Sequence, residues 1–225
     1  MTDRSNRHSP LRRIHLIRHG ETNWNRERRA QGQQESVLTE RGIAQAHTLA
    51  RALGSVPVDE VYSSSSVRAR QTTEILFGER AVPIEYCDLL REIHMGGWEG
   101  RLYAELEAED PAQFRAFWHE PHRFLLSGAE TFETVQQRAL SRLDDILSRS
   151  TAQQIAIVSH GVWIKTLLCH AEKRPLKKLW QPPAMHNCAH SIIDIHGDGS
   201  RHISLYANQP YPVDPPATEP APVPV

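Results

Sequence analysis

Two histidines and two arginines stand at or just after the ends of short apolar segments that the sequence predicts to be β-strands. Arg18 and His19 close the first segment, Arg68 follows the second through a run of serines, and His160 follows the fourth. A carboxylate, Glu92, comes shortly after the third. In an open α/β sheet, ligands bind beyond the carboxyl ends of the strands. We therefore expect these five side chains to meet at one edge of a sheet.

A metal site is the first alternative for two neighbouring histidines. However, Arg18 places a fixed positive charge beside His19, and no ligand spacing rich in Asp or Glu offsets that charge. Guanidinium groups instead match phosphate or carboxylate oxygens in two-point contacts. A neutral imidazole among such donors can attack an anionic phosphoryl group, and a nearby carboxyl can protonate the leaving oxygen and then activate water. These residue types therefore predict phosphoryl transfer at a site with no metal.

The elements that must position these residues alternate along the chain between strand and helix patterns. The predicted strands are 13–18, 56–62, 82–87 and 154–159, followed by a hairpin of 190–195 and 201–206. The predicted helices between them are 39–53, 66–77, 131–148 and 162–170. Strands that alternate with helices predict an α/β fold with a mostly parallel sheet.

The length of 225 residues suits one folded domain with two extensions. We predict a disordered lead-in at residues 1–12, a single α/β domain at 13–208 and an extended tail at 209–225, because seven of the fifteen prolines lie at 210–225. An aromatic, helical stretch at about 102–127 is expected to be an insertion that acts as a lid. Such a lid would set the substrate specificity. Its candidate specificity residues are Trp98, Tyr103, Arg115, Trp118, His119 and Arg123.

Composition excludes several classes of partner. Lys and Arg number 26 against 27 Asp and Glu, so no global positive field favours nucleic acid. No apolar run is long enough to span a membrane, and the first residues lack the apolar segment of a secretory signal. Three scattered cysteines make no disulfide framework, so we expect a cytoplasmic protein. A homodimer is expected only from the general frequency of dimers.

Several motifs, in order along the chain, resemble those of the histidine phosphatase superfamily, which includes the phosphoglycerate mutases. The first motif, Arg18-His19-Gly20-Glu21-Thr22 followed by Trp24-Asn25, is fairly specific by itself. The others are Gln31-Gly32, Leu38-Thr39-Glu40-Arg41-Gly42, Tyr62-Ser63-Ser64, Arg68-Ala69-Arg70-Gln71-Thr72, Leu90-Arg91-Glu92-Ile93, Gly97-Trp98-Glu99-Gly100, Gly128-Ala129-Glu130-Thr131 and Val158-Ser159-His160-Gly161. The resemblance covers residues 14 to about 195 and implies a three-layer sandwich whose mostly parallel sheet contains one antiparallel strand.

The resemblance also implies roles for individual residues. His19 matches the histidine that is phosphorylated, and Arg18, Arg68 and His160 match the groups that hold the phosphoryl oxygens. Glu92 matches the acid/base carboxylate. The substrate-binding residues expected from the matched motifs are Asn25, Gln31, Gly32 and Gly161. A phosphohistidine intermediate follows, with no metal and no cofactor. We expect one ring nitrogen of His19 to donate to a carbonyl in the Gly20 turn, which leaves the other nitrogen free to attack.

Within this family, the segment Glu92–Trp98 departs from the mutase pattern and resembles the phosphatase branch. We therefore expect a phosphomonoester phosphatase that acts on a small phosphorylated metabolite, with a phosphoglycerate mutase as the alternative. A second alternative is a non-catalytic protein that binds a phosphorylated ligand, but such a binder would not need to keep both His19 and Glu92.

Overall fold

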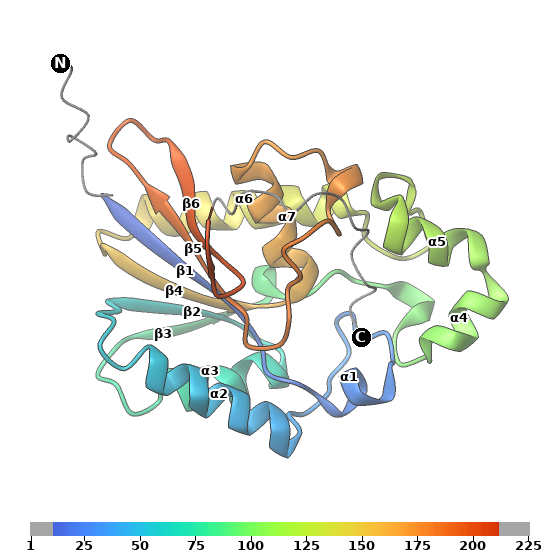
Figure 1. The fold of residues 1–225 in the computed structure, drawn as a ribbon, viewed down its shortest axis with the longest axis horizontal. Helices are drawn as coiled ribbons and strands as arrows, with labels where there is room; N and C mark the ends of the chain where they lie inside the picture. The colour runs from blue at the N-terminus through green and yellow to red at the C-terminus, as the bar shows by residue number, and fades with distance from the viewer. Residues whose placement is uncertain (1–10, 212–225) are drawn as a thin grey trace.

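A mixed β-sheet forms the middle layer of the protein (Figure 1). In this computed structural model, which describes residues 11–211, the strands lie in the order β3-β2-β4-β1-β5-β6-β7. They are β1 (Arg12–Arg18), β2 (Glu60–Ser64), β3 (Ile84–Cys87), β4 (Gln154–Ser159), β5 (His190–Ile195), β6 (Arg201–Tyr206) and β7 (Gln209–Pro210). The predicted alternation of strands and helices is confirmed, although β2 and β3 begin later than expected.

The first four strands in the chain run parallel to one another. β1 pairs in parallel with β4, which pairs in parallel with β2, and β2 pairs in parallel with β3. β5 lies antiparallel on the other side of β1, and the hairpin partner β6 follows it. The predicted mostly parallel sheet with an antiparallel strand is therefore confirmed. The two-residue β7 also runs against the parallel strands, because it is antiparallel to β6.

Helices cover both faces of this sheet and complete the three layers. The helices are α1 (Asn23–Glu27), α2 (Glu40–Ala52), α3 (Val67–Phe77), α4 (Tyr103–Glu109), α5 (Pro111–His119), α6 (Phe132–Arg149) and α7 (Gly161–Ala171). α2 and α3 lie on one face, and α6 and α7 lie on the other (Figure 1). Because both faces are covered, the central strands are apolar almost throughout, as in β4, where Ile155–Val158 is fully buried.

Local sequence signals fix where the helices begin. The Thr39 hydroxyl accepts a hydrogen bond of 3.0 Å from the Gly42 N–H and caps α2, as predicted. Thr131 caps α6 in the same way, through the N–H of Thr134 at 3.1 Å. The short α1 was not predicted. It is fixed by a reciprocal pair of hydrogen bonds between Thr22 and Asn25.

The predicted lid segment, residues 102–127, contains α4, α5 and the short 3₁₀ turn Pro121–Arg123. α4 and α5 lie beyond one end of the sheet (Figure 1). Pro111 begins α5, and the Asp110 carboxylate caps it by accepting 3.0 Å from the Gln113 N–H. The aromatic side chains of this segment pack into the main core rather than into a separate one.

The ordered fold extends slightly beyond the predicted limits at both ends. Leu11 N–H donates 2.8 Å to the Ile195 carbonyl, so strand pairing begins before residue 13. At the other end, β7 pairs with β6, and the Tyr211 N–H donates 3.2 Å to Ser204. Strand pairing thus reaches a few residues beyond the predicted domain limits of 13 and 208, and Pro210 is tolerated because β7 lies at the edge of the sheet. The rest of the predicted lead-in and tail, 1–10 and 212–225, lies outside the described residues.

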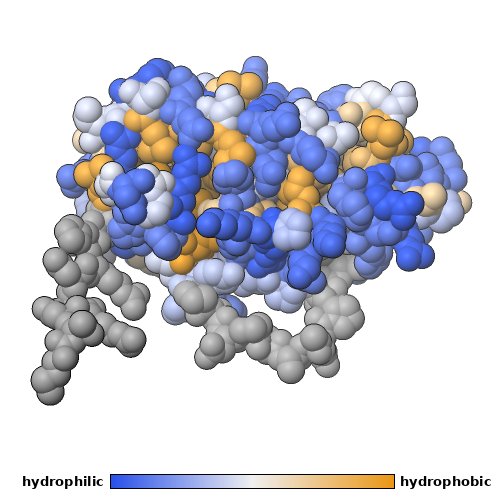
Figure 2. Space-filling view, turned by 90° about the horizontal axis from the view of Figure 1, so that it is seen from above, coloured by the Kyte–Doolittle hydropathy of each residue, from blue (hydrophilic) through white to orange (hydrophobic). Residues whose placement is uncertain are grey.

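The face of the molecule in Figure 2 is mainly hydrophilic, with scattered hydrophobic residues. Among residues 11–211, no helix combines the length and the apolar composition needed to cross a membrane.

Candidate active site

The carboxyl ends of the four parallel strands place the predicted residues around one cavity. β1 ends at Arg18 and leads directly into His19. The turn after β2 begins α3, which carries Arg68 in its first turn. Glu92 follows β3, and His160 links β4 to α7. The cavity has a volume of about 570 Å³, and four of these five residues line it directly, while His160 is fully buried beside His19.

His19 has the geometry of a neutral nucleophile. Its ring is 3% exposed, and Nδ1 lies 2.8 Å from the Gly20 carbonyl oxygen, the contact that the sequence predicts. A carbonyl can only accept, so Nδ1 carries the proton and Nε2 keeps its lone pair. Burial, and then the charges of Arg68 and Arg18, lower the pKa of His19 well below its usual range. The imidazole is therefore uncharged at neutral pH.

The turn that provides this carbonyl packs against α2 at backbone distance. A Cβ atom placed on Gly20 would lie 2.6 Å from the Gly42 carbonyl oxygen. A Cβ atom on Gly42 would lie 2.0 Å from the Glu21 carbonyl oxygen. Neither position has room for a side chain, so this pair of glycines allows the first turn of α2 to fix the loop after His19.

Arg18 and Arg68 are buried guanidinium groups held by main-chain carbonyls. Arg68 donates to Gln34 at 2.9 Å and to Gly32 at 2.7 Å, and Arg18 donates to the carbonyl of Met185. The Nε atom of each arginine is buried and has no partner among the described residues. Burial lowers the pKa of Arg68 to about 10, so the group stays charged at neutral pH. Each arginine thus keeps one buried donor available for an anion.

His160 packs against the nucleophile, with ring centroids 5.1 Å apart. Its Nε2 lies 2.8 Å from the Ser64 hydroxyl, whereas Nδ1 is buried without a partner within residues 11–211. Burial and the charge of Arg68 lower the pKa of His160 well below its usual range. If Ser64 donates to Nε2, the proton of the neutral ring is on Nδ1, which is a third donor without an acceptor.

The Glu92 carboxylate lies at the first turn of α7. Oε1 accepts from the N–H groups of Ile93 at 3.0 Å and Trp163 at 3.2 Å, and Oε2 accepts from Val162 at 3.1 Å. Three backbone donors and the helix N-terminus hold the group in one orientation. A Cβ atom on Gly161 would lie 3.7 Å from Glu92 Oε2 and 3.6 Å from Arg18 Nε, so Gly161 separates the carboxylate from the guanidinium.

The other predicted substrate-binding residues line the same cavity. Asn25 Oδ1 accepts from Thr22 and from Asn187 Nδ2 at 3.1 Å, so its amide nitrogen is free to face the cavity. Gln31 Oε1 accepts from the hydroxyls of Thr22 and Ser36, which leaves its nitrogen as the available donor. Gly32 contributes through its carbonyl, which receives Arg68.

Asn187 holds two residues of the site together, and the sequence did not indicate it. Its Nδ2 bridges the His19 carbonyl, at 3.3 Å, and Asn25 Oδ1, so it links the nucleophile strand to α1. Ser64, the partner of His160, was within a matched motif but was given no role. The signal for Asn187 is weak, because it lies in a proline-rich loop 168 residues from His19 in the sequence.

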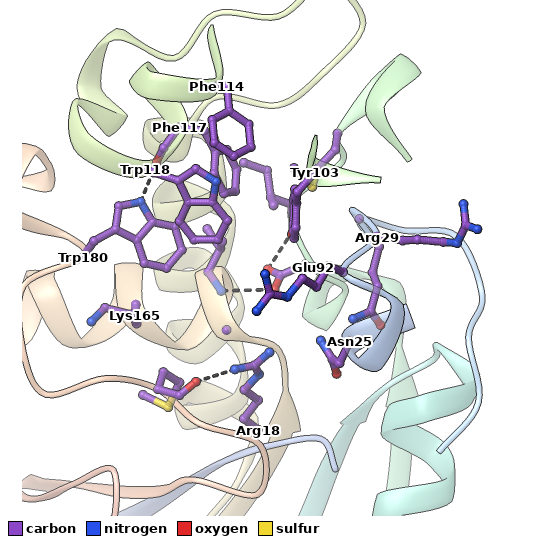
Figure 3. Close-up of a pocket in the computed structure, with 18 of the residues that line it drawn as sticks. Arg18, Asn25, Arg29, Glu92, Tyr103, Phe114, Phe117, Trp118, Lys165 and Trp180 are labelled. Atoms are coloured by element: carbon purple, nitrogen blue, oxygen red, sulfur yellow. Dashed lines mark hydrogen bonds between the residues drawn. The ribbon is translucent and has the colours of Figure 1, made fainter. Parts of the chain in front are cut away.

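Aromatic side chains form the far wall of the cavity (Figure 3). Of the six predicted lid residues, three line the cavity and three do not. Those that line it are Tyr103, Trp118 and His119, and those outside it are Trp98, Arg115 and Arg123. Trp98 is 4% exposed and packs edge-to-face on Phe124, so it belongs to the core beneath the lid. Its predicted role in specificity is not supported.

The arrangement suits transfer of a phosphoryl group. Two buried guanidinium N–H groups and the ring nitrogen His160 Nδ1, none with a partner among residues 11–211, adjoin a neutral imidazole, and a carboxylate lies across Gly161. Charge that gathers on phosphoryl oxygens in the transition state is stabilised by such preset donors. Within residues 11–211, no group of three or more His, Cys, Asp and Glu side chains is placed to hold a metal ion.

Comparison with known proteins agrees with this geometry. Residues 14–208 match the family model described as the histidine phosphatase superfamily (branch 1). Phosphoserine phosphatase 1 of Hydrogenobacter thermophilus is 31% identical over 193 residues, covering 86% of this chain and 90% of that protein. The adenosylcobalamin/alpha-ribazole phosphatase of Salmonella typhimurium is 33% identical over 186 residues, covering 81% and 90%.

A relative named as a mutase and a solved structure complete the comparison. The probable phosphoglycerate mutase GpmB of Erwinia tasmaniensis is 32% identical over 188 residues, covering 80% of this chain and 84% of that protein. The structure of Bacillus stearothermophilus YhfR superposes with a TM-score of 0.84 at 42% identity, covering 88% of this chain and 96% of that one. The fold, the cavity and the matched residues agree, and this chain belongs to branch 1 of the histidine phosphatase superfamily.

Proposed function

We propose that this protein hydrolyses small phosphomonoesters through a phosphohistidine at His19, without a metal ion. The observation that carries the proposal is a set of buried nitrogens without a partner among residues 11–211 beside a neutral imidazole: the donors Arg18 Nε and Arg68 Nε, and His160 Nδ1. Buried polar groups normally have partners, so unpaired guanidinium donors beside an imidazole favour an anionic ligand with several oxygens. The relatives named as phosphatases support the same activity.

The reaction has two steps. His19 Nε2 attacks phosphorus, the bond to the ester oxygen breaks, and protonated Glu92 gives its proton to the leaving alcohol. Glu92 then removes a proton from water, whose oxygen attacks the phosphohistidine. The N–P bond breaks, its electron pair returns to Nε2, and inorganic phosphate leaves. The electropositive donors stabilise the charge on the phosphoryl oxygens in both steps.

The test is a comparison of His19→Ala with His47→Ala, which makes the same change at an exposed position of α2. With p-nitrophenyl phosphate, we expect His19→Ala to lose turnover and to lose the acid-labile phosphoenzyme. His47→Ala should keep both. Full turnover in His19→Ala would rule out this nucleophile. Unchanged turnover after exhaustive treatment with a chelator is expected, and loss that is restored by a divalent metal would refute metal independence.

A phosphoglycerate mutase remains the second candidate because of the GpmB relative. Its bisphosphate intermediate carries a second phosphoryl group, and besides Arg18 and Arg68 the cavity is lined by five aromatic side chains and by the cations Arg28, Arg29 and Lys165. Incubation with 3-phosphoglycerate separates the two activities. Release of inorganic phosphate supports the phosphatase, whereas formation of 2-phosphoglycerate without phosphate contradicts it.

The remaining parts of the proposal concern the cellular location of the enzyme, its oligomeric state and the non-catalytic alternative. We propose that it works in the cytoplasm, as its three unpaired cysteines favour. The homodimer stays a prediction that sedimentation would test. A non-catalytic binder would keep its affinity for phosphate and show no turnover, so the assay with p-nitrophenyl phosphate also decides that alternative.

A further inference from the structure

The cavity wall opposite His19 is built from aromatic side chains. The chain has five residues each of Phe, Tyr and Trp, and five of these fifteen line this one cavity. They are Tyr103 on α4, Phe114, Phe117 and Trp118 on α5, and Trp180 in the loop before β5. The wall therefore presents flat apolar surface to whatever group the phosphate is attached to.

The two tryptophans of this wall differ in how their indole N–H groups are satisfied. Trp180 Nε1 donates to the Phe117 carbonyl at 2.5 Å. Trp118 Nε1 is buried, and it has no hydrogen-bond partner in the part of the chain that the structure describes. The nitrogen of Trp118 lies on the side of the ring that faces Tyr103 across the cavity (Figure 3). Only one of the two indoles thus has a donor to offer to a ligand.

An indole N–H that is buried without an acceptor is costly, so it requires an explanation. The ring of Tyr103 lies edge-to-face with Trp118, with centroids 5.5 Å apart and planes at 76°. A ring face accepts an N–H only weakly. An oxygen or nitrogen acceptor on a bound ligand would therefore improve on the contact that this N–H has within the protein.

Besides Arg18 and Arg68, the cavity is lined by the cations Arg28, Arg29 and Lys165 and by the carboxylates Glu27 and Glu107. Arg28 is exposed, whereas Lys165 and Arg29 have partners within the protein. Lys165 Nζ donates to the carbonyls of Gln181 and Pro183, each at 3.1 Å. Arg29 pairs with Glu27 at 2.7 Å. The aromatic wall itself accordingly offers stacking surface and one uncharged N–H group, which suits an aromatic group on the ligand.

We propose that the alcohol part of the preferred substrate carries a flat aromatic or heteroaromatic ring with a hydrogen-bond acceptor, and that Trp118 Nε1 binds this acceptor. The inference rests on the proposed phosphatase activity and extends it to the leaving group. Trp118 is then a specificity-determining residue. The ring stacks on the aromatic wall while the phosphoryl group reaches His19 at the other end of the cavity.

The experiment uses two series of esters with similar alkyl leaving groups. Meta- and para-acetylbenzyl phosphate each carry a carbonyl acceptor, and the matching isopropylbenzyl phosphates have nearly the same shape without one. Trp118→Phe should lower kcat/KM for the better acetyl ester about 5- to 10-fold, as expected for one lost hydrogen bond. It should change the isopropyl esters by less than about twofold. The intrinsic reactivity of each ester cancels in these ratios.

Two control variants separate recognition from packing. Trp98→Phe makes the same change in the same aromatic cluster but outside the cavity, so it should affect both series equally and slightly. Trp180→Phe removes an N–H that binds the protein itself, so any loss should be equal for both series. An equal loss for both series in Trp118→Phe would overturn the inference.

A measurement on the unaltered enzyme is independent of how the variants fold. It should prefer one acetylbenzyl ester over its isopropyl partner, and it should prefer benzyl phosphate over glycerol phosphate, whose leaving group is also an alkyl alcohol. Absence of either preference would contradict the inference. If no ester yields phosphate or a phosphoenzyme, the proposed function itself fails, whereas normal hydrolysis without these preferences refutes only the inference about the leaving group.

Discussion

Replacing Glu92 with glutamine tests the acid and base roles directly, because the two steps respond differently to the leaving group. A benzyl alcoholate needs a proton to depart, whereas p-nitrophenolate is stable as an anion. Glu92→Gln should therefore lower kcat/KM for benzyl phosphate by about 10² to 10⁴, the usual contribution of a general acid. The loss for p-nitrophenyl phosphate should be about tenfold or less, because proton donation assists that departure little.

The geometry of the carboxylate also sets a cost in stability. If the glutamine oxygen keeps the contacts of Oε1 with Ile93 and Trp163, the amide nitrogen faces the N–H of Val162. Two donors then oppose each other, and the Val162 N–H loses its acceptor. We expect a loss of about 1–3 kcal/mol in the free energy of unfolding. Glu130→Gln, at a carboxylate outside the cavity that binds the His94 N–H and pairs with Arg138, is the control for replacing a partly buried carboxylate.

Rapid mixing provides the decisive assay. In Glu92→Gln the attack of water lacks its base, so p-nitrophenolate should appear as a burst close to one equivalent of enzyme, followed by slow turnover. Glu130→Gln should lose stability but keep the ordinary ratio between the two esters. Equal losses for both esters in Glu92→Gln, without a burst, would refute the assignment of Glu92 as acid and base.

Two further predictions concern buried cationic and neutral groups. The lysine in Arg68→Lys cannot make both carbonyl contacts of Arg68 and also donate to a phosphoryl oxygen, so kcat should fall about 10²- to 10³-fold. The control is Arg142→Lys, which changes a buried arginine that pairs with acidic groups away from the cavity and should keep kcat near that of the unaltered enzyme. A similar kcat in both variants would contradict the role of Arg68. The buried histidines His15 and His190 lie side by side, with 2.9 Å between His15 Nδ1 and His190 Nε2. Burial lowers the pKa of both imidazoles, that of His190 to about 3. The unfolded chain therefore binds more protons below pH about 6.5, and the free energy of unfolding should fall by about 1.4 kcal/mol per pH unit for each such histidine as the pH drops further. His190→Gln should make this slope shallower in denaturant titrations, and an unchanged slope would contradict the linkage.

The features that could be predicted from the sequence are those that depend on residues close together along the chain. The alternation of apolar runs located the strand ends, and with them Arg18 and His160. The contact of His19 with Gly20 was also predictable, because the two residues are adjacent. In each case the deciding interaction lies within one element or one turn.

Features that depend on packing between distant segments were missed or placed wrongly. Trp98 and Trp118 are both aromatic residues near the predicted lid, yet only Trp118 lines the cavity. Their difference follows from how α4 and α5 fold over the sheet, which no local pattern specifies. Asn187 was missed for the same reason, since its two partners lie at the other end of the chain.

The close approach of Gly20 and Gly42 has a consequence for how this enzyme can change over evolution. Gly42 does not line the cavity, but its lack of a side chain lets α2 pack against the loop that contains Gly20, whose carbonyl oxygen selects the tautomer of His19. Gly42→Ala would displace the loop after His19 and would therefore lower the catalytic rate. The aromatic wall, by contrast, is the part of the cavity that we propose binds the leaving group. Substrate preference can therefore drift through the lid while the backbone around this pair of glycines stays fixed.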